Sequence, residues 1–65
     1  MMDWRKFHEQ WVGKKFRWRQ GNRQETRRVI ETTLGCDVIY VSGRYRYNTT
    51  AELWLEWIKH AKEVE

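Results

Sequence analysis

Two short segments of the sequence, Lys15–Arg19 and Arg44–Tyr47, alternate cations with aromatic residues. A β-strand points successive side chains to opposite faces. The period of two therefore predicts two strands, each with one aromatic face and one cationic face. Because rings and cations cannot share a face of one flat strand, we expect the aromatics in the core and the cations in solvent.

Further strands are indicated by β-branched residues and by the turn residues between them. Gly21-Asn22 can form a two-residue hairpin loop, because both residue types accept a positive φ. Leu34–Cys36 interrupts the β-branched run that follows, and Ser42-Gly43 supplies the next turn. The predicted strands are 14–19, 25–33, 37–41 and 44–47.

A short amphipathic helix is predicted over residues 3–12. Asp3 is a favourable N-cap residue, the apolar stripe runs from Trp4 to Trp11 at helical spacing, and Gly13 is a favourable stop. A helix of this length is marginal alone in water. We therefore expect it to dock through its aromatic side chains.

A second helix is predicted over residues 50–63. Thr49 and Glu52 have the spacing of a capping box, the clearest helix start in the chain. The apolar residues that follow cover an arc of roughly 200°, wider than packing on one sheet face requires. We expect the excess to meet the first helix or a second subunit, through Leu53, Leu55 or Trp57.

These elements predict one α+β domain over residues 1–65. The strands form either a small antiparallel sheet, with both helices on one side, or an open SH3-like barrel of 3–4 strands. The N-terminal helix is short and the C-terminal helix closes the chain. The pattern does not separate the sheet from the barrel.

The core of such a small chain must be built from large side chains. At 65 residues, only about 60% of the surface of the unfolded chain is buried on folding. A single Cys36 cannot form an internal disulfide, and its spacing from His8 and His60 matches no zinc motif. We therefore expect no metal and no cofactor. Five Trp, three Tyr and two Phe are the available core material.

The net charge of +4 is unevenly distributed. Residues 14–28 carry a local charge of +6, with Glu25 as their one acidic residue, whereas residues 50–65 sum to −2. The positive charge therefore belongs to the predicted sheet and the negative charge to the C-terminal end. Such asymmetry is typical of an electrostatic binding face.

The cationic face predicts a nucleic-acid-binding module. Eight of the thirteen cations are Arg, whose planar fork suits phosphates and guanine edges. Arg27 and Arg28 are adjacent in a strand, so only one of them can share that face. DNA is weakly favoured over RNA. The predicted phosphate contacts are Lys15, Arg17, Arg19, Arg27, Arg28, Arg44 and Arg46.

The alternative is a protein-interaction module, an inhibitor or adaptor of the kind that mobile genetic elements encode. An acidic protein surface is complementary to the same basic face, and Trp, Tyr and Arg are enriched at interface hot spots. Such a partner would use the basic face or the C-terminal helix. Through that helix the chain would be a homodimer, and otherwise a monomer.

An enzyme is not expected. Cys36 has no histidine near it in sequence, Ser42 lies in a turn without a nucleophile-elbow pattern, and the four glycines stand singly. The sequence has no apolar run near the roughly 20 residues that span a bilayer and no signal-peptide pattern, so we expect a cytoplasmic protein without a membrane partner.

Overall fold

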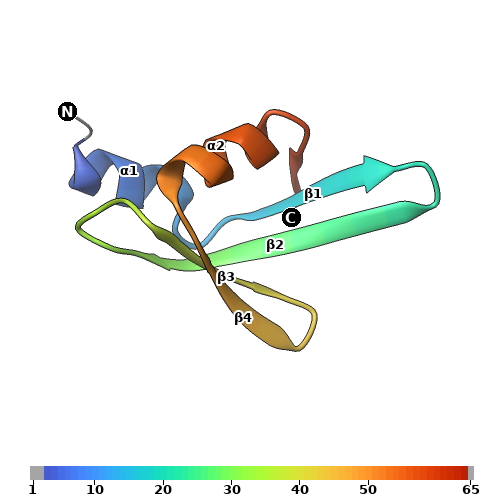
Figure 1. The fold of residues 1–65 in the computed structure, drawn as a ribbon, viewed down its shortest axis with the longest axis horizontal. Helices are drawn as coiled ribbons and strands as arrows, with labels where there is room; N and C mark the ends of the chain where they lie inside the picture. Colours follow the sequence, from blue (N-terminus) through green and yellow to red (C-terminus); the bar gives the residue numbers. More distant parts are fainter. Residues whose placement is uncertain (1–2, 65) are drawn as a thin grey trace.

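The computed structural model describes residues 3–64 as two helices and five strands (Figure 1). The helices lie on one side of a twisted sheet, and the hairpin of the first two strands extends beyond them (Figure 1). In chain order the elements are α1 (Trp4–Trp11), β1 (Lys15–Gln20), β2 (Arg23–Thr32), β3 (Val38–Ser42), β4 (Tyr45–Thr49), α2 (Ala51–Ile58) and β5 (Lys62–Val64).

The sheet is antiparallel throughout and open. Its strand order is β4-β3-β2-β1-β5, so β4 and β5 are the two edges and no pairing closes a barrel. The predicted α+β class is confirmed. Of the two layouts that the sequence left open, the structure has the open sheet rather than the SH3-like barrel, with five strands rather than three or four.

Two tight hairpin turns fix the register of the sheet. Gln20 pairs with Arg23 across Gly21-Asn22, and the β3–β4 hairpin has an equivalent two-residue loop that begins with Gly43. Both glycines have positive φ, 59° and 63°. Positive φ at the first loop residue alone is the pattern of a type II′ turn, which matches the twist of the flanking strands.

A β-bulge in β2 shifts its register against β3. Val29 is opposite Tyr40 and Glu31 is opposite Ile39, so Ile30 is the additional residue. An additional residue reverses the alternation of faces along the strand. As a result Val29 and Thr32 both face the core, although three positions separate them.

The first helix begins and ends close to the predicted limits. The Asp3 carboxylate accepts a hydrogen bond of 2.9 Å from the Arg5 backbone N–H, which caps α1. Gly13 follows the helix with a φ of 85°, a conformation that favours glycine. Neither described helix is long and apolar enough to cross a membrane.

The second helix differs from the prediction at both ends. Its cap is Thr50, whose hydroxyl accepts a hydrogen bond of 3.2 Å from the Leu53 backbone N–H, while Thr49 belongs to β4. The helix ends at Ile58 instead of residue 63. Its last turn tightens, because the His60 N–H donates to the Trp57 carbonyl at 3.1 Å. The chain then reverses into β5, which pairs with β1.

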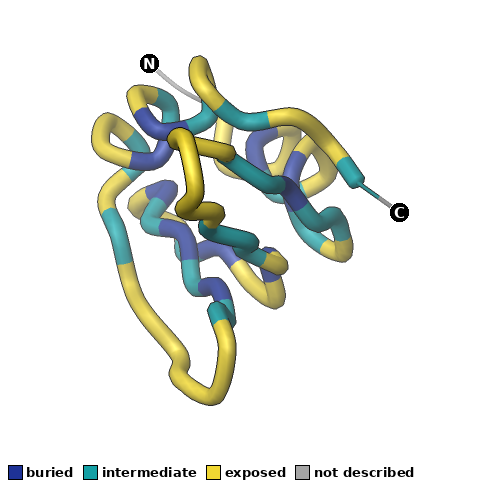
Figure 2. The backbone as a smooth tube through the Cα atoms, turned by 90° about the vertical axis from the view of Figure 1, so that its right-hand side faces the viewer, coloured by how far each residue is buried: buried dark blue, intermediate teal, exposed yellow. Residues whose placement is uncertain are grey.

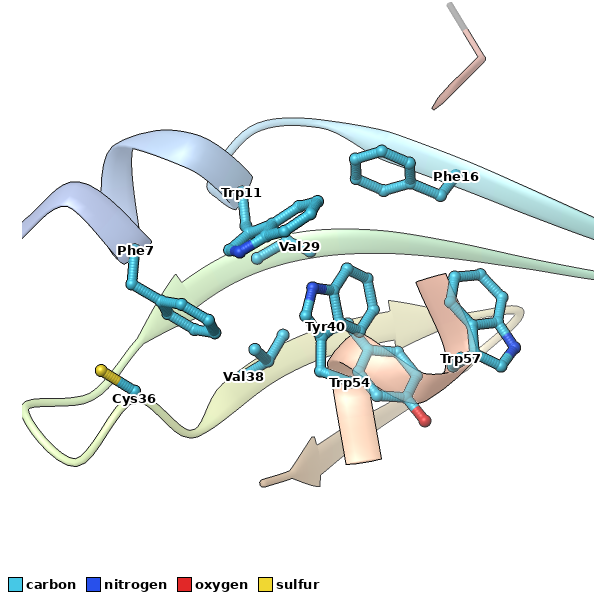
Figure 3. Close-up of a cluster of buried hydrophobic side chains, with 9 residues drawn as sticks. All are labelled: Phe7, Trp11, Phe16, Val29, Cys36, Val38, Tyr40, Trp54 and Trp57. Carbon is cyan, nitrogen blue, oxygen red and sulfur yellow. The ribbon is translucent and has the colours of Figure 1, made fainter. Parts of the chain in front are cut away.

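Aromatic side chains fill the space between the two helices and the sheet (Figure 3). Trp11 of α1 packs edge-to-face on Phe16 of β1 and on Trp54 of α2, with ring centroids 5.5 and 5.7 Å apart. Trp54 is fully buried and also stacks on Trp57. Both helices therefore cover the same face of the sheet, which we call the inner face. The buried core residues are Phe7, Trp11, Phe16, Val29, Cys36, Val38, Tyr40, Trp54 and Trp57.

Candidate nucleic-acid interface

The register of the sheet gathers cations on its outer face, the face that points away from the helices. Directly opposed residues of antiparallel strands lie on one face. Lys15 is opposite Arg28, and Arg17 is opposite Lys62. Along β1 and β2 these positions alternate with inward-facing residues, among them the buried Phe16 and Val29. We call the following set the basic face: Lys15, Arg17, Arg19, Arg28, Arg46 and Lys62.

The cations of the basic face are placed close to one another rather than beside acids. Like charges directly opposite each other, such as Lys15 and Arg28, destabilise a sheet by roughly 0.2–1 kcal/mol. Within residues 3–64 the ion pairs are Arg27–Glu25 and Lys59–Glu56, and neither involves this face. The register adds one acid to the outer face, Glu31, opposite Ile39. The positive charge of the outer face is therefore largely uncompensated.

One arginine of the basic face is held in a fixed orientation. The Arg17 Nε donates a hydrogen bond of 3.1 Å to the Thr26 hydroxyl on the neighbouring strand. This bond occupies one of the five N–H donors of the guanidinium and leaves the others for a ligand. Ordering the side chain before binding reduces the entropy that a ligand contact would cost.

Five of the seven cations predicted to contact phosphate lie together on the basic face. Arg44 does not lie in a strand, because it is the second residue of the β3–β4 hairpin loop. Arg46 lies on β4, which is exposed along most of its length (Figure 2). Arg28 is exposed on the outer face, whereas Arg27 points to the inner face and is removed from the predicted set.

Arg27 is part of the aromatic layer. Its guanidinium lies 4.2 Å from the centroid of the Trp57 ring and 4.5 Å from that of Tyr40, and its Nε donates to the Glu25 carboxylate at 2.6 Å. The side chain is only 14% exposed. Burial raises the pKa of the Tyr40 phenol, and the positive charge of Arg27 partly opposes that rise. Arg27 therefore contributes to the stability of the fold and is not placed to contact a ligand on the basic face.

Lys62 is the cation that sequence reasoning missed. The predicted helix 50–63 includes this residue, but β5 places it opposite Arg17 on the basic face. The sequence between Ile58 and Lys62 contains no Gly or Pro to end the helix. Lys62-Glu63-Val64 shows no polar–apolar alternation, so the local pattern does not mark β5 as a strand.

Of the aromatics that alternate with the cations, Phe16, Trp18 and Tyr47 pack against other rings, whereas Tyr45 is 67% exposed, so the expected core position is wrong for Tyr45. Trp18 stacks on His60 with centroids 4.6 Å apart, and Tyr47 stacks on Tyr40 at 5.4 Å. Beside these pairs, Leu53 and Trp57 help to line an open groove of about 500 Å³ between the sheet and α2. The groove opens on the side of the helices, so it is separate from the basic face.

His8 and Cys36 lie apart from the basic face. The His8 Nδ1 lies 2.9 Å from the Thr32 hydroxyl, and Cys36 is buried in the turn between β2 and β3. Among residues 3–64 no three His, Cys, Asp or Glu side chains are grouped to hold a metal. Comparisons of the chain with protein-family models, curated proteins and solved structures find no match. Function is therefore inferred from the charge and packing of these residues.

Proposed function

We propose that this protein is a non-enzymatic nucleic-acid-binding module that holds the phosphate backbone on its basic face. The observation that carries this proposal is the concentration of six cations on the face that the core does not use. Cross-strand neighbours of like charge oppose folding. Phosphates placed between them would remove that repulsion, so binding a polyanion would offset this cost to the fold.

The division of the sheet into two faces supports the proposal. The helices and aromatic rings on the inner face provide the core, so no cation of the basic face is required there. A polyanion would contact cations from the three neighbouring strands β5, β1 and β2 and from the edge strand β4 beyond β3. Arginine and lysine contacts of this kind depend on phosphates rather than on bases. Affinity through this face alone would be independent of sequence.

Removing one opposed pair of cations tests the proposal. A Lys15→Ala/Arg28→Ala variant should bind a random 30-bp duplex about tenfold more weakly than the unmodified protein at about 50 mM salt, because two phosphate contacts are lost. Mobility shift or fluorescence anisotropy measures the change. Circular dichroism and denaturation confirm that the variant is folded.

The matched control removes the same two charges from the helix side of the molecule. Lys6 lies on α1 and Lys59 follows α2, and both are exposed. A Lys6→Ala/Lys59→Ala variant should retain the affinity of the unmodified protein. Equal losses of duplex affinity in the two variants would show that affinity depends only on the net charge of the protein and not on the basic face. No binding to the duplex at about 50 mM salt would contradict the proposal itself.

The second candidate is an acidic protein partner on the same face or on α2. Leu53 is 62% exposed and Tyr47 is 44% exposed beside the groove, which gives this side an apolar rim. Trp57 is buried and Leu55 is half-buried, so a homodimer through α2 would rest mainly on Leu53. Sedimentation of the protein alone, with Leu53→Glu as the comparison, tests the homodimer.

A further inference from the structure

The end of the β1–β2 hairpin is a two-stranded ribbon that extends beyond the rest of the sheet (Figure 1). β5 pairs with β1 only over residues 15–17, and β3 pairs with β2 only from Arg28 onward. Residues 18–20 and 23–25 therefore pair with each other and with no third strand among the described residues 3–64. Both edges of the ribbon are free to approach a ligand.

The hairpin tip, residues 19–24, has an unusual composition. All six residues are exposed, and none of them is acidic or apolar. Apart from Gly21, each one is Arg, Asn or Gln. A solvated turn requires no such restriction, because Ser, Asp, Lys or Glu serve equally well there. Arg pairs in a bidentate manner with guanine O6 and N7, and Asn or Gln with adenine N6 and N7.

The dimensions of the ribbon match the major groove of B-form DNA. Three residues of β1 extend past the end of β5, and at about 3.3 Å per residue they span roughly 10 Å. The major groove is about 8.5 Å deep and about 12 Å wide, and it admits a two-stranded β-ribbon. The minor groove is about 6 Å wide, and the major groove of A-form RNA is too narrow for side chains to reach the bases.

The base of the ribbon is braced by the core. Trp18, on the inner face, contacts Trp57 with centroids 6.3 Å apart and stacks on His60. The tip is therefore held in a defined direction relative to the sheet. On the outer face, Arg19 is opposite Gln24 and directly continues the basic face along the ribbon. A duplex held on that face would therefore lie beside these two side chains as well.

We propose that the hairpin tip enters the major groove of duplex DNA and contacts base edges, with Arg19 on guanine and Gln24 on adenine. This inference rests on the proposed function, because the other five cations of the basic face hold the phosphates while Arg19 and the rest of the tip contact the bases. It adds sequence preference to a surface that would otherwise bind every duplex equally. The remaining tip residues, Gln20, Asn22 and Arg23, supply further base contacts or positioning contacts.

Repeated selection from a pool of 20-bp duplexes with randomised sequence tests the inference. The unmodified protein should enrich a preferred sequence that contains guanine and adenine. An Arg19→Ala/Gln24→Ala variant should enrich none, and it should still bind the unselected pool, more weakly, through the other five cations of the basic face. Lys15→Ala/Arg28→Ala is the matched control, because it should bind all sequences more weakly and still enrich the same one.

The preferred duplex is then prepared with 7-deazaguanine, which lacks the major-groove N7 acceptor. A loss of tenfold or more in affinity, about 1.4 kcal/mol, supports contact with that groove. Unchanged affinity overturns the inference, as does enrichment by the Arg19→Ala/Gln24→Ala variant or binding of the pool by the unmodified protein without enrichment. Failure to bind the unselected pool at about 50 mM salt would instead contradict the proposed function.

Discussion

The two faces of the sheet use the same kinds of residue in opposite ways, and Arg27 and Arg28 show the difference at a single step along β2. Arg27 lies between two aromatic rings and is ion-paired to Glu25. Arg28 is exposed, is opposite Lys15, and has no ion pair within residues 3–64. Both residues are arginine, so residue type does not account for the difference. The face that each side chain occupies decides whether its charge stabilises the fold or remains free for a ligand.

The largest effect is expected where the inner face is most completely buried. Trp54→Ala should lower the free energy of unfolding by about 3–5 kcal/mol, because it removes a fully buried ring that contacts Trp11, Phe16 and Trp57. A chain of this length is typically stable by roughly 3–10 kcal/mol, so much of the variant would be unfolded. Urea denaturation followed by circular dichroism measures the change.

Leu53→Ala is the control for that substitution. Leu53 precedes Trp54 in α2 but is 62% exposed, so its loss should change the free energy of unfolding by about 0.5 kcal/mol or less. A comparable loss in both variants would contradict the assignment of the core.

The adjacent arginines provide the sharpest test of the two faces. Arg27→Ala should cost about 1–3 kcal/mol of stability, because it removes two cation–π contacts and leaves Glu25 without its partner. Arg28→Ala should leave stability nearly unchanged and should weaken duplex binding. Urea denaturation measures the stability of both variants, and fluorescence anisotropy measures their affinity for duplex DNA. The assignment of the two faces would be wrong if Arg28→Ala lowered stability while Arg27→Ala weakened duplex binding.

A smaller effect is expected from relieving the repulsion on the outer face. The Lys15→Ala/Arg28→Ala variant should be as stable as the unmodified protein or more stable, by up to about 1 kcal/mol at low salt. Added salt screens exposed charges, so the difference should shrink as salt rises. Denaturation at two salt concentrations measures it, and a marked destabilisation would show that these cations support the fold.

The smallest effect concerns the alkaline range of pH. The pKa of Tyr40 is raised in the folded protein, so its neutral form is favoured there. Its contribution to stability is complete below about pH 10 and is lost as the pH rises through the folded pKa. Tyr40→Phe should therefore reduce the loss of stability above pH 10. An unchanged pH profile would show that Tyr40 titrates as an exposed phenol does.

Much of this arrangement was accessible from the sequence because its signals are local. Alternation at 15–19 separates Phe16 from Arg17, and Gly21 marks the first hairpin loop. The α+β class and the shared face of Lys15, Arg17 and Arg19 follow from these patterns. Which of Arg27 and Arg28 faces outward depends on strand register, which the sequence left open.

The remainder depends on tertiary contacts. The end of α2 carries no stop signal, and the chain leaves the helix to pair β5 with the free edge of β1. The bulge at Ile30 reverses the faces of β2 without any Gly to mark it. Lys62 was missed because the sequence does not show that α2 ends at Ile58. The free length of the hairpin tip is visible only when the third-strand pairings are known.

The salt dependence of duplex binding tests the central claim most directly. If the basic face neutralises five phosphates, or six when Arg19 also contacts one, the logarithm of the association constant should fall with the logarithm of salt concentration with a slope of about −5. The Lys15→Ala/Arg28→Ala variant should give about −3.5, and the Lys6→Ala/Lys59→Ala variant should match the unmodified protein. A slope near zero, or one slope shared by all three proteins, would contradict phosphate binding on the outer face of the sheet.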